Sequence, residues 1–274
     1  MSFHRFEDNA LGKGFTPHLS TSKNHLVEGD YLYYNLNTKA AGTGSEPHYH
    51  PNELLVFCIR GRINALVGKE RHVIEPGTAV VVPPCARHSF KAAEEADCAY
   101  LYIKDHTWSL VGIAEDEALP DQAMSVEDAH KMHDAGLWPG QKDTSGQSSA
   151  IIEGYASCFY PILSSLEEPI GQVDREIKLS GTLIDFGFFE FPRKFEKTED
   201  KSEHERFIYI LAGSAEATVD GETKTVVVGD IVKMPKGCSY RLSQGDSEGG
   251  VRFTMHSSNA LMEKMVDEQA KSAG

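Results

Sequence analysis

The sequence predicts an all-β protein in which one pattern of strands and turns occurs twice. Short segments rich in β-branched and aromatic residues are bounded by glycine throughout both halves of the chain. In the first half these segments are "YLYYNL", "LLVFCI", "INALV", "TAVVVP" and "CAYLYI". In the second half they are "TLIDFGFFEF", "RFIYIL" and "ATV". Segments of this length and composition are typical of strands.

The second observation is an internal repeat with a constant offset. The stretch that begins "ELLVFCIRG" aligns without gaps on the stretch that begins "ERFIYILAG". The offset is 152 positions for Glu53 and Glu205, Gly61 and Gly213, Gly77 and Gly229, and Pro83 and Pro235. The glycines recur where turns require a positive φ or a close backbone approach. We therefore expect a tandem duplication of one β topology.

Length, charge and cysteine content narrow the class of protein. A chain of 274 residues is long enough for two domains with their own cores. The formal net charge of -14 argues against binding to a nucleic-acid backbone. The five cysteines include no Cys-x-x-Cys pair, so we expect free thiols. No segment has the length and apolarity of a membrane span, and the charged N-terminus does not resemble a secretory signal, which favours a cytoplasmic protein.

The remaining segments predict two helices and a linker. Residues 116–149 are polar, and within them "SVEDAHKMHDAG" begins with Ser125 and Asp128 in the manner of a capping box. A C-terminal helix is predicted in "SSNALMEKMVDEQAK" beneath a serine or asparagine cap. Its apolar residues at helical spacing are Leu261, Met262, Met265 and Val266. The predicted domains are residues 1–115 and 150–274, joined by the helical and polar linker 116–149.

Three histidines in the first half are the candidate metal ligands. In "HYHPNELLVFCIRG", His48 and His50 lie two positions apart, so on a strand they point to the same face, about 6.8 Å from each other. His88 follows the apolar segment "TAVVVPP" and is placed to supply a third nitrogen from an adjacent strand. The alternative is that His48 and His50 are half-exposed polar residues near a strand end.

These motifs resemble those of the cupin superfamily, and the whole chain resembles a bicupin. The residues that carry the resemblance are Gly44, His48, His50 and Gly61 for the first motif, and Gly77, Pro83 and His88 for the second. Cys85 stands where the family commonly has glycine. The resemblance implies an antiparallel jelly-roll barrel in each half and a metal inside the first. With the predicted helices, the expected fold is two tandem cupin domains with a short inter-domain helix and a C-terminal helix.

A fourth ligand from glutamate stays open. Many metal-binding cupins carry a glutamate on the histidine face, but alternation from His50 places Asn52 on that face and Glu53 on the other. A bulge at Pro51 would return Glu53 to the metal. The second half keeps Glu205 although it has lost the histidines, which favours a structural glutamate and a degenerate second site. In place of the histidines it has Asp200, Ser202 and Tyr240.

Three neutral imidazoles would leave the charge of a divalent ion uncompensated in a barrel of low dielectric, which favours an anionic ligand. Three-histidine cupins that resemble this arrangement include gentisate, salicylate, β-diketone and thiol dioxygenases, all iron(II) enzymes. The resemblance therefore implies an oxidoreductase, a non-haem Fe(II) dioxygenase of a small anionic aromatic or 1,3-dicarbonyl substrate. The other residues expected on the barrel face are apolar and suit such a substrate. They are Leu54, Val56, Cys58, Val80 and Val82.

Two other functions stay open from the sequence. A Mn, Ni or Zn ion at the same site would act as a Lewis acid in a lyase, isomerase or hydrolase of a small organic acid. A half that has lost its ligands also agrees with a non-catalytic small-molecule binding protein. Tyr100, Tyr102 and Lys104 share one strand face and are candidates for substrate contact, or for packing. The sequence assigns no catalytic side chain and leaves the substrate, the metal and a homodimer open.

Overall fold

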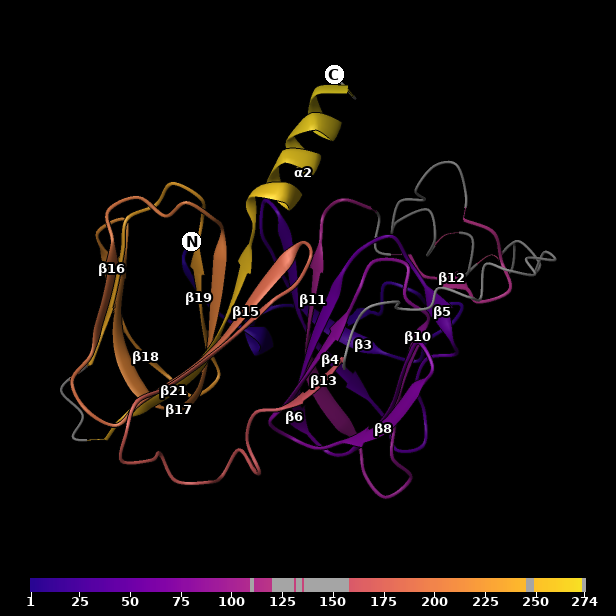
Figure 1. Cartoon of the computed structure of the whole chain (residues 1–274), viewed down its shortest axis with the longest axis horizontal. Coiled ribbons are helices and arrows are strands. Elements are labelled where there is room, and N and C mark those ends of the chain that lie inside the picture. The colour runs from indigo at the N-terminus through magenta and orange to yellow at the C-terminus, as the bar shows by residue number, and fades with distance from the viewer. Residues whose placement is uncertain (109–110, 120–130, 132–134, 136–157, 245–248, 273–274) are drawn as a thin grey trace.

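The computed structural model describes residues 1–108, 111–119, 131, 135, 158–244 and 249–272. Two β-barrels lie side by side, and the C-terminal helix α2 (Ala260–Ser272) projects from one end of the molecule (Figure 1). The predicted all-β fold of two tandem barrels with a C-terminal helix is confirmed. The predicted inter-domain helix falls almost wholly outside the described residues.

The first barrel consists of two antiparallel sheets that enclose a core. The strand order of one sheet is β13 (Phe159–Pro161), β9 (Thr78–Val82), β6 (Leu54–Arg60), β11 (Cys98–Asp105), β4 (Leu32–Lys39), β3 (Lys23–Glu28) and β2 (Gly12–Lys13). The strand order of the other is β12 (Ile113–Ala114), β5 (His48–Tyr49), β10 (His88–Ala92), β7 (Ile63–Val67) and β8 (Glu70–Ile74). His48 and His88 therefore lie on the second of these sheets, and His50 lies just beyond the end of β5.

The second barrel repeats this plan around one long strand. Its strand order is β1 (Phe3–Arg5), β19 (Asp230–Met234), β17 (Arg206–Val219), β21 (Val251–Ser258), β15 (Ile184–Phe191) and β14 (Arg175–Ser180). Further strands paired with β17 or with each other are β16 (Glu196–Glu199), β18 (Glu222–Val227) and β20 (Tyr240–Ser243). Gly213 and its equivalent Gly61, both with φ of 71°, mark the point where the chain passes from one sheet to the other. The repeat therefore extends to the backbone conformation of this turn.

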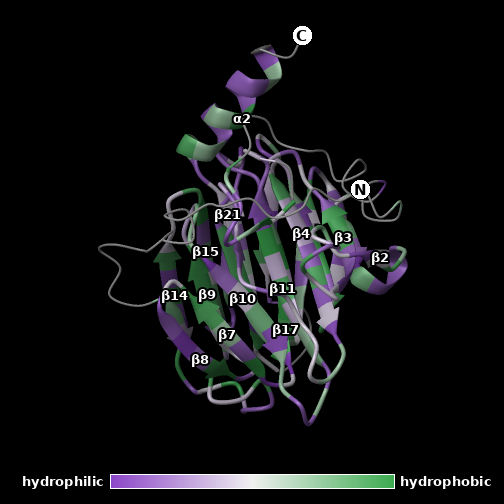
Figure 2. Cartoon of the chain, turned by 90° about the vertical axis from the view of Figure 1, so that its right-hand side faces the viewer, coloured by the Kyte–Doolittle hydropathy of each residue, from purple (hydrophilic) through white to green (hydrophobic). Residues whose placement is uncertain are grey.

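Strands β6, β9 and β11 are apolar on both faces because each face packs against a different core. One face fills the first barrel, where the predicted residues Leu54, Val56, Cys58, Val80 and Val82 are all buried. The other face packs against the second barrel through Leu55, Phe57, Val81, Leu101 and Ile103, which meet Phe186, Phe188 and Phe207. A strand buried on both sides carries a near-continuous apolar run instead of an alternating one. Figure 2 shows the hydrophobic residues along β9 and β11.

The first strand of each half joins the sheet of the other barrel. β1 pairs with β19, with Phe3 opposite Val232, and β13 pairs with β9, with Phe159 opposite Val80. Val80 and Val232 are themselves 152 positions apart, so the two exchanged strands occupy equivalent places in the repeat. The domains of residues 1–115 and 150–274 therefore stay a prediction from the sequence, and β1 and β13 each lie in the barrel of the other half.

Two buried glutamates connect the barrels in the same reciprocal manner. The Glu53 carboxylate accepts hydrogen bonds of 2.7–2.8 Å from three successive backbone N–H groups, those of Thr182, Leu183 and Ile184. The Glu205 carboxylate accepts bonds of 2.7–2.9 Å from the backbone N–H groups of Asp30, Tyr31 and Leu32. The offset of 152 positions relates each donor to its equivalent, as it relates the two glutamates.

Glycine provides the room for each of these carboxylates. A Cβ atom on Gly181 would overlap the carboxylate of Glu53, and one on Gly29 would overlap that of Glu205. Burial raises the pKa of both glutamates, whereas the backbone N–H bonds act in the opposite direction. Glu53 points away from His50, as alternation predicts, and its oxygens are committed to the other barrel.

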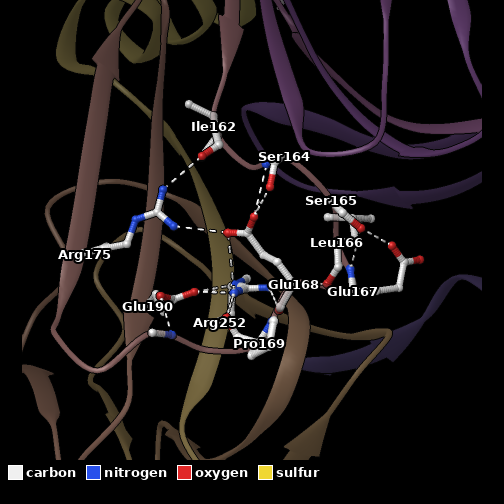
Figure 3. Close-up of polar contacts among 11 residues, drawn as sticks. Ile162, Ser164, Ser165, Leu166, Glu167, Glu168, Pro169, Arg175, Glu190 and Arg252 are labelled. Carbon is white, nitrogen blue, oxygen red and sulfur yellow. Dashed lines mark hydrogen bonds and ion pairs between the residues drawn. The ribbon is translucent and has the colours of Figure 1, made fainter.

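A buried arginine fixes the segment that leads into the second barrel. The Arg252 side chain is fully buried and forms an ion pair with Glu190, with nitrogen–oxygen distances of 2.5 and 2.6 Å. It also donates hydrogen bonds of 3.0–3.3 Å to the backbone carbonyls of Leu166, Glu168 and Pro169 (Figure 3). All three nitrogens of the guanidinium therefore have hydrogen-bond acceptors.

We expect Arg252→Met to lower the free energy of unfolding by about 3–5 kcal/mol, because it leaves the Glu190 carboxylate buried without its partner. Urea unfolding followed by circular dichroism measures this change. The matched control is Arg241→Met, because Arg241 pairs with Glu196 at a half-exposed position and such pairs contribute little. Equal losses of stability in the two variants would contradict the role given to Arg252.

The C-terminal helix forms with the predicted asparagine cap, and two of its four apolar residues pack against the barrels. The Asn259 side-chain oxygen accepts a hydrogen bond of 3.0 Å from the backbone N–H of Met262. Met262 is buried and Val266 partly buried against the core between the barrels, whereas Leu261 and Met265 are exposed. Only one edge of the projecting helix meets the barrels, so the helical spacing of these four residues did not decide which of them pack. Neither α2 nor the short η1 (Phe6–Asp8), the helices of the described chain, is suited to cross a bilayer.

Candidate metal centre

Strands β5 and β10 bring the three predicted histidines together inside the first barrel. His48 lies directly opposite His88 in the antiparallel pair of β5 and β10, and His50 follows β5. The distance between ring centroids is 4.3 Å for His48 and His88, 4.7 Å for His50 and His88, and 6.0 Å for His48 and His50. The potential ligand atoms all lie within 4.8 Å of one another. Within the described part of the chain, no other cluster of metal-ligating side chains is arranged in this way.

A backbone carbonyl orients each of these rings. The Nδ1 atoms of His48, His50 and His88 bond to the carbonyl oxygens of Glu46, Asn52 and Ala86, at 2.7, 3.1 and 2.8 Å. Because a carbonyl oxygen only accepts, each Nδ1 carries the proton and each Nε2 keeps its lone pair. The Nε2 atoms of His50 and His88 are buried and have no hydrogen-bond partner among the residues that the structure describes. This donor set fits a divalent metal ion.

Burial also keeps the imidazoles neutral, which is the form that coordinates a metal. All three side chains are buried, with exposed fractions of 1–5%. Desolvation lowers the pKa of His48 and His50 well below the usual value of histidine, and that of His88 to about 3. The buried Lys104 ammonium acts in the same direction on all three pKa values. No proton therefore competes with an ion at neutral pH.

Asp105 holds the chain immediately after His50. Its Oδ1 accepts hydrogen bonds from the Asn52 side chain at 2.9 Å and from the backbone N–H of Thr107 at 2.8 Å. Its Oδ2 accepts one of 2.8 Å from the backbone N–H of Glu53. Asn52 thus supports the loop, and the Asp105 carboxylate is occupied by this network. These bonds fix the direction in which the chain leaves His50.

Gly112 supports His48 and was missed by the sequence analysis. A Cβ atom at this position would overlap the His48 ring, and the backbone N–H donates a hydrogen bond of 3.0 Å to Thr16 Oγ1. The following strand β12 pairs with β5, with Ala114 opposite His48. Nothing in "SLVGIAED" marks this glycine, because the close approach arises only in the folded chain.

The wall formed by β4 is polar, unlike the apolar wall of β6 and β9. Alternate residues Asn35, Asn37 and Lys39 lie opposite Tyr102, Tyr100 and Cys98 of β11, which belong to the interior core. The segment "YLYYNL" predicts a strand, as observed, but the polar alternation that continues from Asn35 to Lys39 was not recognised in the sequence. The expectation of a largely apolar barrel face is therefore correct for β6 and β9 and wrong for β4.

Lys39 is the buried cation of this wall, with an exposed fraction of 3%. Its Nζ donates a hydrogen bond of 2.6 Å to the carbonyl oxygen of Phe90 and lies 5.6 Å from the centre of the Tyr100 ring. Burial lowers the pKa of Lys39 to about 7. Burial has the same effect on Lys104, whose pKa is also about 7. The interior therefore holds two lysines.

A cavity lies between the histidines and this polar wall. Its volume is about 20 Å³, about the room that one ordered water molecule needs. Its lining includes His48 and His88, Asn37 and Lys39, and the two tyrosines Tyr100 and Tyr102. Among the described residues around it, none is acidic. Both tyrosines thus face the place where a ligand of the histidine site would sit, whereas Lys104 is not part of this lining.

The equivalent place in the second barrel has a different construction. Asp200 is exposed, and the Ser202 hydroxyl donates a hydrogen bond of 2.7 Å to a backbone carbonyl. The Tyr240 hydroxyl accepts a bond of 3.0 Å from Arg206 and donates one of 3.2 Å to Glu199. Arg206 is the equivalent of Leu54, 152 positions earlier. Where the first barrel has this buried leucine, the second barrel has an arginine that forms an ion pair with Glu199.

Cys85 occupies a turn in which its equivalent is glycine. The N–H of Cys85 bonds to the His50 carbonyl at 2.8 Å, and the N–H of Gly237 makes the matching bond of 2.7 Å to Ser202. The φ angle is 62° at Cys85 and 85° at Gly237, a region that disfavours any side chain. Cysteine is thus strained at a place where the repeat and the family both use glycine.

We expect Cys85→Gly to raise the free energy of unfolding by about 1 kcal/mol through relief of this strain. The matched substitution Gly237→Ala introduces a side chain at the equivalent turn and is expected to lower stability by a similar amount. Thermal unfolding of both variants is the measurement. A less stable Cys85→Gly would show that the thiol has contacts that outweigh the strain.

The fold and the site define a double-barrel β protein with a three-histidine centre in its first barrel. The first half matches a family described as "Cupin domain" over residues 35–104, and the second matches the "EutQ-like cupin domain" over residues 194–254. Each half therefore contains a match to a cupin family model, and the fold is that of two cupin domains in tandem. No curated protein matches it in sequence.

Solved structures of oxalate decarboxylase superpose on the chain. One concerns the substrate binding mode and reaction specificity switch of that enzyme, one is a tryptophan-to-tyrosine variant from Bacillus subtilis, and one concerns its Mn(II) centres. Each has a TM-score of 0.62 and 16% identity, and each alignment covers 94% of this chain and 77% of the other. At this identity the likeness shows the fold.

Proposed function

We propose that the protein is a metal-dependent lyase of a small organic acid, with one divalent ion held by His48, His50 and His88. The observation that carries the proposal is a buried set of three neutral imidazoles beside a cavity that Lys39 lines and no described acidic side chain enters. An ion there would make the cavity positive, the protonated form of Lys39 would add to that charge, and a medium of low dielectric favours an anion that balances it. When bound, the metal would act as a Lewis acid on an oxygen of the substrate.

The lyase alternative has more support than the iron dioxygenase that the sequence analysis favoured. The solved structures named above are of oxalate decarboxylase, and one of them concerns its Mn(II) centres, which makes manganese our first choice ahead of nickel or zinc. The polar wall of β4 also suits a small acid better than an aromatic ring, which needs apolar contacts on both faces. Nothing in the site or the comparisons specifically supports iron or oxygen chemistry.

The test is a substrate screen with and without oxygen. Protein purified without chelators is loaded with manganese, incubated with a panel of small mono- and dicarboxylic acids under argon and in air, and followed by nuclear magnetic resonance. We expect turnover that requires the metal but not oxygen, that His88→Ala abolishes and that Ser202→Ala in the second barrel leaves unchanged. Turnover only by iron-loaded protein with uptake of oxygen would restore the dioxygenase reading. Ligand-induced stabilisation without any product would instead identify a binding protein.

A further inference from the structure

Lys39 and Asn37 lie two residues apart on β4 and therefore on the same face of the strand. Both side chains line the cavity beside the histidines. To the described residues, Lys39 Nζ makes one hydrogen bond, to the carbonyl of Phe90, although an ammonium group has three donors. Among the described residues, the Oδ1 atom of Asn37 is buried with no hydrogen-bond partner, although the Asn37 side chain is hydrogen-bonded to the Tyr100 side chain. The wall thus presents free donors beside a free acceptor.

Packing does not account for these two residues. A buried amine with one acceptor and a buried amide oxygen with none both cost free energy, and apolar residues of similar size would avoid that cost. The second barrel shows this solution at the equivalent positions, 152 residues later, where Phe189 and Phe191 are buried in its core. The polar wall therefore occurs in the barrel that has the histidine cluster and not in the barrel that lacks it.

We infer that Lys39 and Asn37 form a second recognition point of this site, which binds an anionic group of a substrate whose other end reaches the histidine centre. Lys39 neutralises and hydrogen-bonds that group, and Asn37 Oδ1 accepts a hydrogen bond from a hydroxyl or protonated oxygen beside it. The substrate class is a small dicarboxylate, or a hydroxy acid with a second anionic group. This inference rests on the proposed function because it places the other end of the substrate at the metal.

The test compares the binding of simple anions to metal-loaded and metal-free protein by calorimetry. The probes are oxalate, malonate and succinate, with acetate as the single-carboxylate reference. The variants are Lys39→Met, Lys39→Arg and Asn37→Leu, and the matched control is Lys91→Met, which removes an exposed lysine paired with Glu46. Manganese content and thermal unfolding are measured for every variant.

We expect at least one dicarboxylate to bind wild-type protein about tenfold or more tightly than acetate, which corresponds to about 1.4 kcal/mol. Lys39→Met should abolish this preference with unchanged manganese content, Lys39→Arg should retain part of it, and Lys91→Met should leave it intact. An absent preference, or one that survives in Lys39→Met, would overturn the inference. If Lys39→Met does not fold, Asn37→Leu and Lys39→Arg take its place. A preference for the dicarboxylate that is unchanged in both variants would then overturn the inference. If the wild-type protein binds no manganese, that result counts against the proposed function. The binding of anions to metal-free protein still tests the role of Lys39 separately.

Discussion

The variant His50→Ala is expected to bind less than about one tenth of a metal ion per chain, compared with about one ion in the wild-type protein. The reason is geometric, because the ring nitrogens of three histidines within 4.8 Å of one another supply all the ligands that the described residues offer at this site. Glu53 and Asp105 do not replace the lost nitrogen, since both carboxylates are held by backbone N–H groups and neighbouring side chains. Elemental analysis of protein purified without a polyhistidine tag measures the change.

The repeat provides a matched control for this variant. Ser202 is the equivalent of His50 in the second barrel, and its buried hydroxyl bonds only to a nearby backbone carbonyl among the described residues. Ser202→Ala is therefore expected to keep the wild-type metal content and nearly the wild-type stability. Equal metal content in wild type and His50→Ala would show that any bound metal lies elsewhere.

The second large effect concerns the glutamates that join the barrels. We expect Glu53→Gln and Glu205→Gln each to lower the free energy of unfolding by about 3 kcal/mol. The amide lacks the charge that strengthens the three hydrogen bonds from the backbone N–H groups. Its NH₂ group is also a donor, so it faces N–H groups that it cannot accept from. For a chain of this size such a loss lowers the melting temperature by about 6–12 °C. Thermal and urea unfolding of both variants provide the measurement.

The same pair of variants separates a structural glutamate from a fourth metal ligand. If Glu53 only connects the barrels, Glu53→Gln and Glu205→Gln lose similar amounts of stability and both keep the metal. A ligand role would instead make Glu53→Gln lose metal while Glu205→Gln retains it. Either a marked difference in metal content or a negligible effect on stability would contradict the reciprocal arrangement.

Sequence patterns predicted the features that depend on local spacing. The constant offset of 152 residues relates the two halves even at the level of single hydrogen bonds, such as those donated by the backbone N–H groups of Cys85 and Gly237. Alternation placed Glu53 on the face opposite His50, and the interior positions of β6 and β9 followed from the same period of two. The three histidines meet because β5 and β10 are neighbours in the sheet. That they bind a metal remains a proposal.

The features that sequence did not predict depend on contacts between distant segments. The exchange of β1 and β13 and the backbone donors of Glu53 arise where the barrels meet, and no local pattern specifies them. The close approach of Gly112 to His48 has the same origin. The polar wall is different, since Asn35, Asn37 and Lys39 alternate visibly along β4. The apolar and aromatic residues of the same segment concealed that signal.

The central claim is that one divalent ion binds in the first barrel and none binds in the second. Anomalous X-ray diffraction from crystals of manganese-loaded protein, collected at the manganese absorption edge, tests it most directly. The account predicts a single strong peak within about 2.0–2.3 Å of the Nε2 atoms of His48, His50 and His88. No peak there after loading, or a peak near Arg206 and Tyr240 in the second barrel, would contradict it.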